Sequence, residues 1–285
     1  MRIGRIGGTA AEGIDGRAWL VTPAVLLLLV VFLYPVGWLL LRSVNEPVWG
    51  LQNYASALQQ PVYLRVFWNT IVISASVTAL CLAIGYPVAY TMAHAGARAR
   101  RFLVFIVLVP FWTSLLVRTF AWMVVLQRDG LINDMLIGLG LLKTPADLIY
   151  NRIGVLIGMV QVQLPFMILP LYSVLTKIDP LYTQAAATLG APPWRNFLRV
   201  YLQLSLPGAL TGCALVFIIS LGYFITPALL GGRQDVMIAQ LILIQIEDFG
   251  NWGLAAALAM ILLVGTAISF ALIRRATAAR AGWAR

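Results

Sequence analysis

Residues 184–208, QAAATLGAPPWRNFLRVYLQLSLPG, separate two long apolar runs with a small, basic segment. Around its start the chain favours a helix from Leu181 to Leu189, because Leu, Gln and Ala propagate helices well. Asp179 is placed to cap this helix, and Pro180 stands at the first helical position, where proline is tolerated. We therefore expect a short capped helix in a chain that is otherwise built for lipid.

The second half of the segment predicts a turn and another helix. Gly190 suits a left-handed C-terminal cap, and Pro192 and Pro193 end one helix but can start the next. We expect that second short helix from Trp194 to Leu202. The alanines of the first helix leave a surface with little bulk, which another protein can approach closely. An ordinary loop helix lying on the membrane is the alternative interpretation.

The composition of the chain indicates a membrane protein. Of its 285 residues, 61% are hydrophobic and only 11% are charged, whereas soluble domains carry about 25% charged residues. Cys81 and Cys213 sit in apolar runs without metal-ligand spacing, and we interpret them as packing residues. His94 has no second His or Cys nearby, so no metal site is predicted.

Six apolar segments are long enough to span a membrane, which needs about 20 residues. They define an all-α membrane protein with one domain, residues 18–275, a tail at 1–17 and a second tail at 276–285. Residues 233–250 are predicted to form an interfacial or gate-lining helix, since their apolar centre is too short to span. The six expected spans are 18–41, 68–93, 102–127, 153–176, a segment within 200–232, and 251–273.

The distribution of positive charge predicts the orientation of these spans. With the N-terminus in the cytoplasm, thirteen of the 20 Lys and Arg residues fall in inside segments and six fall outside. Both termini and the loop at 177–203 are therefore expected to be cytoplasmic. The same asymmetry accounts for the net charge of +10 without a nucleic-acid partner.

The segment at 184–208 resembles the signature loop of inner-membrane permease subunits of bacterial binding-protein-dependent ABC importers. That signature is Glu-Ala-Ala, three residues, Gly, nine residues, then an apolar and proline-rich run. Two positions depart from it, because Gln184 stands in place of the usual Glu and Gln203 in place of a common proline. The residues that hold the spacing are Gln184, Ala185, Ala186, Gly190, Val200, Leu202, Leu206 and Pro207.

Four further segments resemble the spermidine/putrescine-type branch of these permeases. They are PFWTSLLVRTFAW (110–122), LPFMILPLYSVL (164–175), GYFITPALLGG (222–232) and NWGLAAALA (251–259). The resemblance implies a polyamine such as spermidine or putrescine as the solute. Permeases for opines and other amino-type solutes share these segments, so they remain the alternative.

The resemblance also implies the architecture and the partners. A type I ABC importer has two permease subunits, usually different chains, two cytoplasmic ATPase subunits and an extracytoplasmic binding protein. The chain lacks a GxxxxGK[ST] loop, so ATP and Mg are expected on the ATPase partners, and no catalysis is expected here. The residues expected to contact an ATPase are Gln184, Ala185, Ala186, Ala187, Leu189, Gly190, Ala191 and Pro192.

The translocation path has fewer candidates. Arg118 is an ionisable residue inside a span, which marks a functional candidate. It follows Phe102 by 16 residues, so a straight helix places it roughly 24 Å from the cytoplasmic edge. Snorkelling, or pairing with another subunit, is the alternative. Aromatic faces can bind a cation, although packing is the alternative for each, and the candidates are Trp112, Trp122, Tyr223 and Phe224.

The last outer loop carries an acidic pair, Glu247 and Asp248. We expect it to contact the binding protein or the gate, and a solvated loop tip is the alternative. Two other protein classes are less compatible with the sequence. An ion-coupled secondary transporter needs ionisable midplane sites and repeats, and a membrane enzyme needs convergent catalytic or metal-binding residues.

Overall fold

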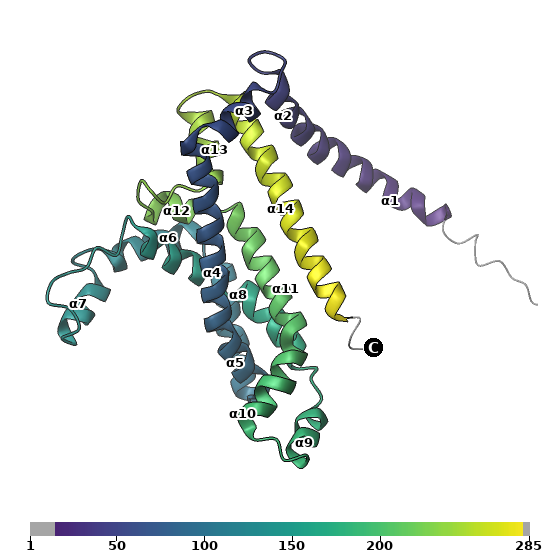
Figure 1. The fold of residues 1–285 in the computed structure, drawn as a ribbon, viewed down its shortest axis with the longest axis vertical. Coiled ribbons are helices and arrows are strands. Elements are labelled where there is room, and N and C mark those ends of the chain that lie inside the picture. The colour runs from purple at the N-terminus through teal and green to yellow at the C-terminus, as the bar shows by residue number, and fades with distance from the viewer. Residues whose placement is uncertain (1–14, 282–285) are drawn as a thin grey trace, which may run out of the picture.

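The computed structural model describes residues 15–281, and over that range the chain is helical without a strand (Figure 1). The predicted all-α fold is confirmed. Residues 1–14 and 282–285 of the two predicted tails lie outside the described residues, whereas 276–281 continue the last helix. In chain order the elements are α1 (Asp15–Leu28), η1 (Leu29–Leu33), α2 (Tyr34–Asn45), α3 (Gln52–Gln59), α4 (Pro61–His94), α5 (Ala97–Leu108), η2 (Val109–Trp112), α6 (Leu115–Leu126), α7 (Leu131–Gly138), α8 (Arg152–Leu175), α9 (Pro180–Thr188), α10 (Pro193–Asn196), η3 (Phe197–Tyr201), α11 (Leu202–Leu221), α12 (Ile225–Leu230), α13 (Ile238–Glu247) and α14 (Trp252–Ala281).

Five helical segments in the described chain are long and apolar enough to cross a membrane, or six when one bent pair is counted as a span. These are the predicted spans, with shifted boundaries. Helix α13 is apolar but has only 10 residues, which agrees with the expected short helix before the last span. The five are Thr22–Asn45, Pro61–His94, Arg152–Leu175, Pro193–Leu221 and Trp252–Ile273.

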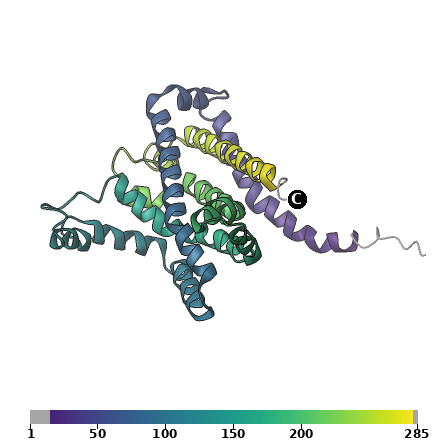
Figure 2. The ribbon, with the colours of Figure 1, turned by 60° about the horizontal axis from the view of Figure 1, so that its bottom comes forward.

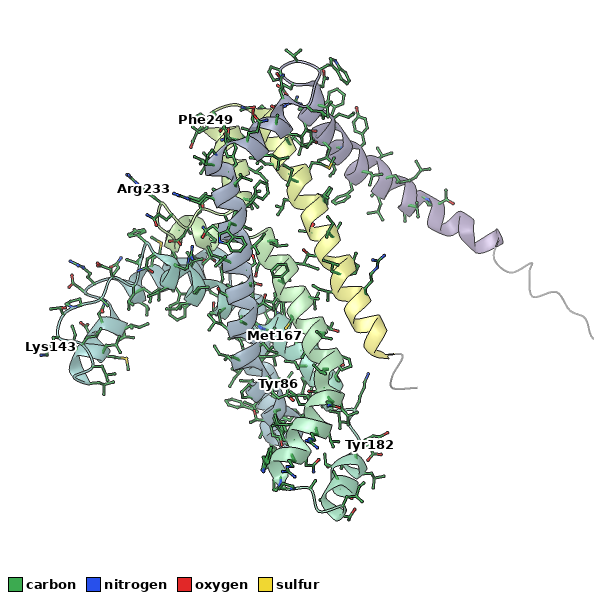
Figure 3. All side chains as sticks on the ribbon, viewed as in Figure 1. Tyr86, Lys143, Met167, Tyr182, Arg233 and Phe249 are labelled. Carbon is green, nitrogen blue, oxygen red and sulfur yellow. The ribbon has the colours of Figure 1, made fainter. Side chains whose placement is uncertain are left out.

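Helices α4, α8 and α11 form the core and lie side by side in both ribbon views (Figures 1 and 2). Met167 of α8 lies at the centre of this bundle (Figure 3). Gly212 of α11 lets the two helices approach closely, because a Cβ there would lie 2.7 Å from Met167 Sδ. Cys81 is a fully buried free thiol of the same core, which agrees with a packing role.

The first span lies at the edge of the molecule. The window of greatest hydropathy in Thr22–Asn45 has none of its residues buried by the rest of the chain. Its second half, α2, packs on α14, while α1 leans away from the bundle in Figure 1. This span therefore contributes a helix to the membrane but little to the core.

The third predicted span, 102–127, is not one straight helix. The segments Ala97–Trp112 and Leu115–Gly138 meet at an angle of 100°. Pro110 removes a backbone donor, the helix tightens into the 3₁₀ turn η2, and Thr113 is extended and Ser114 non-helical before α6 begins. The straight helix that was assumed for the depth of Arg118 is therefore wrong, and the depth itself stays a prediction.

The fifth span begins earlier than predicted. The segment expected as a separate helix, Trp194 to Leu202, is continuous with the span through α10, η3 and α11. The prediction placed the span inside the uncharged stretch 200–232, but Arg195 and Arg199 lie on the same helix, which ends at Leu221. The helix is longer than its apolar part because backbone hydrogen bonding continues through the basic residues at its start.

Helix α7 and the loop after it form an arm that extends away from the bundle, and α6 joins this arm to α8 and α12 (Figure 1). The arm ends in a loop that contains Lys143 (Figure 3). Asn133 is fully buried and donates to the carbonyl oxygens of Gln127 and Ala146, at 3.0 Å each. These bonds give the loop a defined shape without an apolar core of its own.

Candidate functional site

The α9 loop, residues 176–192, begins with a capped helix. The Asp179 side chain accepts a hydrogen bond from the Leu181 N–H at 2.9 Å, and Pro180 occupies the first position of α9. Both predictions for this helix start are confirmed. The bond satisfies one of the backbone donors that a helix N-terminus leaves free.

The end of α9 is closed by a glycine turn. Gly190 has φ +79°, so the predicted left-handed conformation is confirmed. The Gly190 N–H donates to the Ala187 oxygen at 3.0 Å, and the Ala191 N–H donates to the Ala186 oxygen at 3.1 Å. These are the two bonds of a Schellman motif, which satisfies the last carbonyl groups of a helix.

The α9 loop presents small and apolar groups to its surroundings. Leu189 is 87% exposed, the highest exposure among the large exposed apolar side chains of the described chain. Gln184, Ala185, Ala187 and Gly190 are exposed too, while Ala186, Ala191 and Pro192 are partly buried. All eight residues predicted to contact a partner thus lie together on one short, capped element.

The junction of α9 with the bundle is partly hollow. A cavity of about 470 Å³ lies between α9, the end of α4 and the end of α8. Across it, the Asn196 side chain of α10 donates to the Thr183 oxygen of α9 at 2.9 Å. The cavity is lined by Tyr90, Ala93, His94, Leu175, Thr176, Ile178, Pro180, Thr183, Pro193, Asn196, Phe197 and Tyr201.

Aromatic rings from two helices meet beside this cavity. Phe197 and Tyr201 of η3 stack with ring centroids 5.9 Å apart. The Tyr90 ring of α4 meets both of them edge-on, at 5.9 Å from Phe197 and 5.2 Å from Tyr201. Tyr86 and His94 extend the contact along α4 in each direction. We call Tyr86, Tyr90, His94, Phe197 and Tyr201 the ring cluster.

A polar cluster lies where α6, α8 and α12 meet. Arg118, in the first turn of α6, has a buried Nε atom without a hydrogen-bond partner among the described residues. The Tyr223 side chain lies beside Thr226 and within electrostatic range of Arg118. On α8, Gln163 accepts a hydrogen bond from Ser220 at 3.0 Å. The structure thus brings Arg118 and Tyr223 together with polar groups that the sequence did not single out.

The other three aromatic candidates are more exposed or lie apart. Trp112 is 74% exposed at the bend before α6, and Trp122 is half-buried two turns further along. Phe224 is partly exposed at the start of α12. An exposed aromatic ring on a span is equally suited to lipid, a partner subunit or a solute.

At the opposite end of the bundle, which we call the α13 end, polar side chains tie three segments together. Asn69 of α4 donates to the carbonyl oxygens of Gln234 and Val236, at 3.0 and 3.1 Å. Arg152, at the start of α8, pairs with Asp235 at 3.2 Å and also donates to Asn69. We call Asn69, Arg152 and Asp235 the polar knot.

The acidic candidates lie near the same end. Glu247 is the last residue of α13 and Asp248 follows it, and both are exposed. Phe249, the next residue, marks their position in Figure 3. Helix α13 itself packs on α14 and α4, so the pair is carried by a helix fixed to two spans.

Comparison with known proteins identifies the family. Residues 85–279 match the model of the binding-protein-dependent transport system inner membrane component. The chain belongs to this family. The permease is 39% identical over 214 residues to the spermidine/putrescine transport system permease protein PotB of Haemophilus influenzae. The aligned region covers 75% of this chain and 74% of the relative. The Escherichia coli PotB is 34% identical over 222 residues, covering 78% and 80%.

Solved structures share the fold of the permease. A chain of a bacterial alginate ABC transporter, solved in complex with an alginate pentasaccharide-bound periplasmic protein, superimposes with a TM-score of 0.70 at 20% identity. The match covers 92% of this permease and 96% of that chain. Together with the family match and the PotB relatives, the apolar helices identify the molecule as the permease subunit of an ABC importer, a multi-pass inner-membrane protein.

Several residues of the permease that position these elements were not found from sequence. Asn196 and Thr183 were unremarkable polar residues, and Tyr90 was one aromatic residue in a long apolar run. Asn69 and Asp235 stand 166 positions apart, so their connection had no local signature. The one sequence feature that indicated such contacts was the presence of polar residues within or beside a span, because an unpaired polar group is costly there.

Proposed function

We propose that this permease subunit forms half of the path through which an ATP-driven importer takes up a polyamine, with spermidine or putrescine as the best candidates. The observation that carries the proposal is the identity of 39% with a spermidine/putrescine permease over three quarters of both chains. A binding protein outside the membrane delivers the solute, and a second permease subunit, a different chain, completes the pore. An opine or another amino-type solute is the alternative substrate.

The substrate proposal is tested in proteoliposomes that contain the whole complex. Labelled putrescine, spermidine and an opine are supplied with the binding protein, with and without ATP inside. We expect uptake of a polyamine only with ATP. Uptake of the opine and not of a polyamine would show that the solute is an opine. Uptake without ATP would support an ion-coupled secondary transporter instead.

In this proposal the permease does no catalysis, and the partner ATPase subunits bind ATP and Mg. Each permease places its α9 loop in a groove of one ATPase. The exposure of Leu189 and the small side chains beside it support this role, since they allow close approach of a partner surface. The contact residues are Gln184, Ala185, Ala186, Ala187, Leu189, Gly190, Ala191 and Pro192.

The docking proposal is tested by Gly190→Asp. The change forces a charged side chain into a left-handed conformation at the tip of the α9 loop, where φ is +79°. We expect the loaded binding protein to stimulate ATP hydrolysis far less, with uptake lost in parallel. Gly96→Asp is the matched control, because it adds the same charge in the loop after α4 at a φ of −61°. Unchanged stimulation in Gly190→Asp would refute the assignment.

The orientation follows from the same roles. The α9 loop and both termini face the cytoplasm, and the α13 end faces outward, where Glu247 and Asp248 are candidates for contact with the binding protein. The distribution of basic residues supports this arrangement. Single cysteines at Ala187 and Asp248, in a variant without Cys81 and Cys213, should label from opposite sides of intact cells. Labelling from the same side would overturn the orientation.

Arg118, Trp112, Trp122, Tyr223 and Phe224 are proposed for the path or the gate. The Arg118 Nε, which has no hydrogen-bond partner in the described part of the chain, supports a role there, because an intramembrane charge with unmet hydrogen-bonding capacity is costly. Aromatic faces can hold an ammonium group where a span carries no carboxylate. Arg118→Gln should change the KM for the solute or its maximal uptake rate, whereas a residue that only snorkels to the interface should leave both unchanged.

A further inference from the structure

The helix that follows the α9 loop contains an irregular turn. From Pro193 to Leu221 it is one helix, but Phe197–Tyr201 form a π-helical turn, closed by the Leu202 N–H bonding to the Phe197 oxygen. π-turns inside α-helices are rare and occur frequently at functional sites. This one stacks the rings of Phe197 and Tyr201 with an interplanar angle of only 16°.

The stacked rings pack edge-on against α4. Tyr90 crosses Phe197 at 79° and Tyr201 at 76°, and Tyr86 crosses Phe197 at 89°. Edge-to-face arrangements of this kind are favoured by the ring quadrupoles. Tyr201 is only 6% exposed, so the contact is part of the bundle and not a surface feature. A displacement of η3 is therefore transmitted directly to α4.

Besides its chain connection to α8, the α9 loop has a second route to α4, through α10 and η3. The cavity of about 470 Å³ separates Pro180 and Thr183 of α9 from Tyr90, Ala93 and His94 of α4. The Asn196–Thr183 hydrogen bond joins α9 to the helix that carries the rings. This hydrogen bond and the rings therefore form a continuous line of contacts from α9 through α10 and η3 to α4.

We propose that the ring cluster is the joint that couples the α9 loop to α4, with Tyr90 and Tyr201 as its central positioning residues. Tyr86 anchors the joint to the next turn of the span, since its hydroxyl and the Ser205 hydroxyl are 2.9 Å apart. The π-turn aligns Phe197 with Tyr201, and the cavity leaves α9 room to tilt without displacing α4 directly. This inference rests on the proposed function, in which an ATPase moves α9.

The test uses the complete complex in proteoliposomes with the binding protein. Tyr90→Leu and Tyr201→Leu remove ring contacts and leave the surface of the α9 loop unchanged. We expect the ATPase subunits to stay bound and the basal ATP hydrolysis to persist. The ATP consumed per solute imported should rise about tenfold, within the usual range of coupling between sites. The double variant should do little more than either single change, because both act on one contact.

Conservative variants separate coupling from folding. Tyr90→Phe and Tyr201→Phe keep the rings and should restore the ratio of ATP to solute to that of the unaltered complex. The Tyr201 hydroxyl is buried without a hydrogen-bond partner in the described chain, so its removal should cost little. Phe166→Leu is the matched control, since it breaks another edge-on pair, with Phe111 at 5.3 Å, away from the α9 loop.

The outcomes distinguish this inference from the proposed function. If the unaltered complex shows no ATP-dependent uptake, the proposed function fails. If the unaltered complex works and the leucine variants keep its ratio of ATP to solute, the joint is refuted. The same holds if Phe166→Leu raises the ratio as much as the leucine variants do, or if the phenylalanine variants fail to restore it.

Discussion

At the α13 end, side chains bind segments that are far apart in the sequence: Asn69 holds the chain at 234–236, and Arg152 pairs with Asp235. At the α9 end, a cavity separates α9 from α4, the Asn196–Thr183 hydrogen bond joins α9 to α10, and the stacked rings of η3 meet α4. The directional hydrogen bonds and the ion pair at the α13 end hold these segments in one relative position. Edge-on ring packing keeps η3 in contact with α4 without fixing one hydrogen-bond geometry, so the end proposed to receive movement can shift and still transmit it to α4.

The largest effect is expected at the polar knot. Arg152→Ala leaves the Asp235 carboxylate, whose side chain is 9% exposed, with the Gly232 N–H at 3.3 Å as its one remaining donor among the described residues. We expect a loss of stability of about 2–3 kcal/mol, somewhat below that of a fully buried pair, because the Arg152 side chain is 46% exposed. Thermal unfolding of the purified complex measures the change.

A second ion pair provides the control for this prediction. Arg128 and Asp147 also form an ion pair, at 2.7 Å, but their side chains are 68% and 71% exposed. Arg128→Ala should not change the unfolding midpoint measurably, since exposed pairs contribute little. If both alanine variants behave alike, the α13 end is not fixed by its polar knot and the contrast between the two ends disappears.

The next effect concerns the turn at the α9 end. Gly190→Ala forces a side chain into the left-handed region at φ +79°, at a cost of about 1–2 kcal/mol. We expect this cost to fray α9 locally, so protease cleavage within 180–192 should increase while the midpoint of global unfolding stays constant. Gly96→Ala, at a φ of −61°, is the matched control. A fall in the global midpoint would show that the α9 loop is as firmly integrated as the α13 end.

A smaller effect is expected for the hydrogen bond that joins α9 to α10. Asn196→Ala removes its donor to Thr183 and should weaken the attachment by about 1 kcal/mol. The ATP consumed per solute should rise several-fold, and the assembled complex should remain intact on size-exclusion chromatography. Gln203→Ala, at an exposed position on the following helix, should leave the ratio constant. An equal rise in both variants would contradict a role for this hydrogen bond.

The smallest effect is expected at Gln184. The residue is exposed on α9, and Gln184→Glu supplies the acid that related signature loops carry without changing the shape of the helix. We expect ATP-driven uptake to change by less than about twofold, as for most exposed charge changes. A several-fold gain would show that this ATPase partner uses the charge and that Gln184 weakens the coupling.

The local features of the α9 loop were predictable because they depend on neighbours in the sequence. Asp179, Pro180 and Gly190 act on backbone groups within a few residues, and all three adopt the predicted roles. The bend after Trp112 was less accessible. Pro110 could be seen in the sequence, yet a proline inside a span kinks or ends a helix to differing degrees, and Pro87 lies within the unbroken α4.

By itself, the sequence determined that the chain enters a membrane, how its spans follow one another and where a capped helix interrupts them. Composition, apolar length and helix caps act over one element at a time, so one chain is enough to reveal them. Only the tertiary structure decided that Arg152 joins Asn69 to Asp235, that Arg118 comes within electrostatic range of Tyr223, and that Tyr90 lies against Tyr201. Such contacts join residues from 83 to more than 160 positions apart in the sequence, and some of them depend on the bend before α6 or on the π-turn η3. Packing between helices therefore decides which of these residues meet.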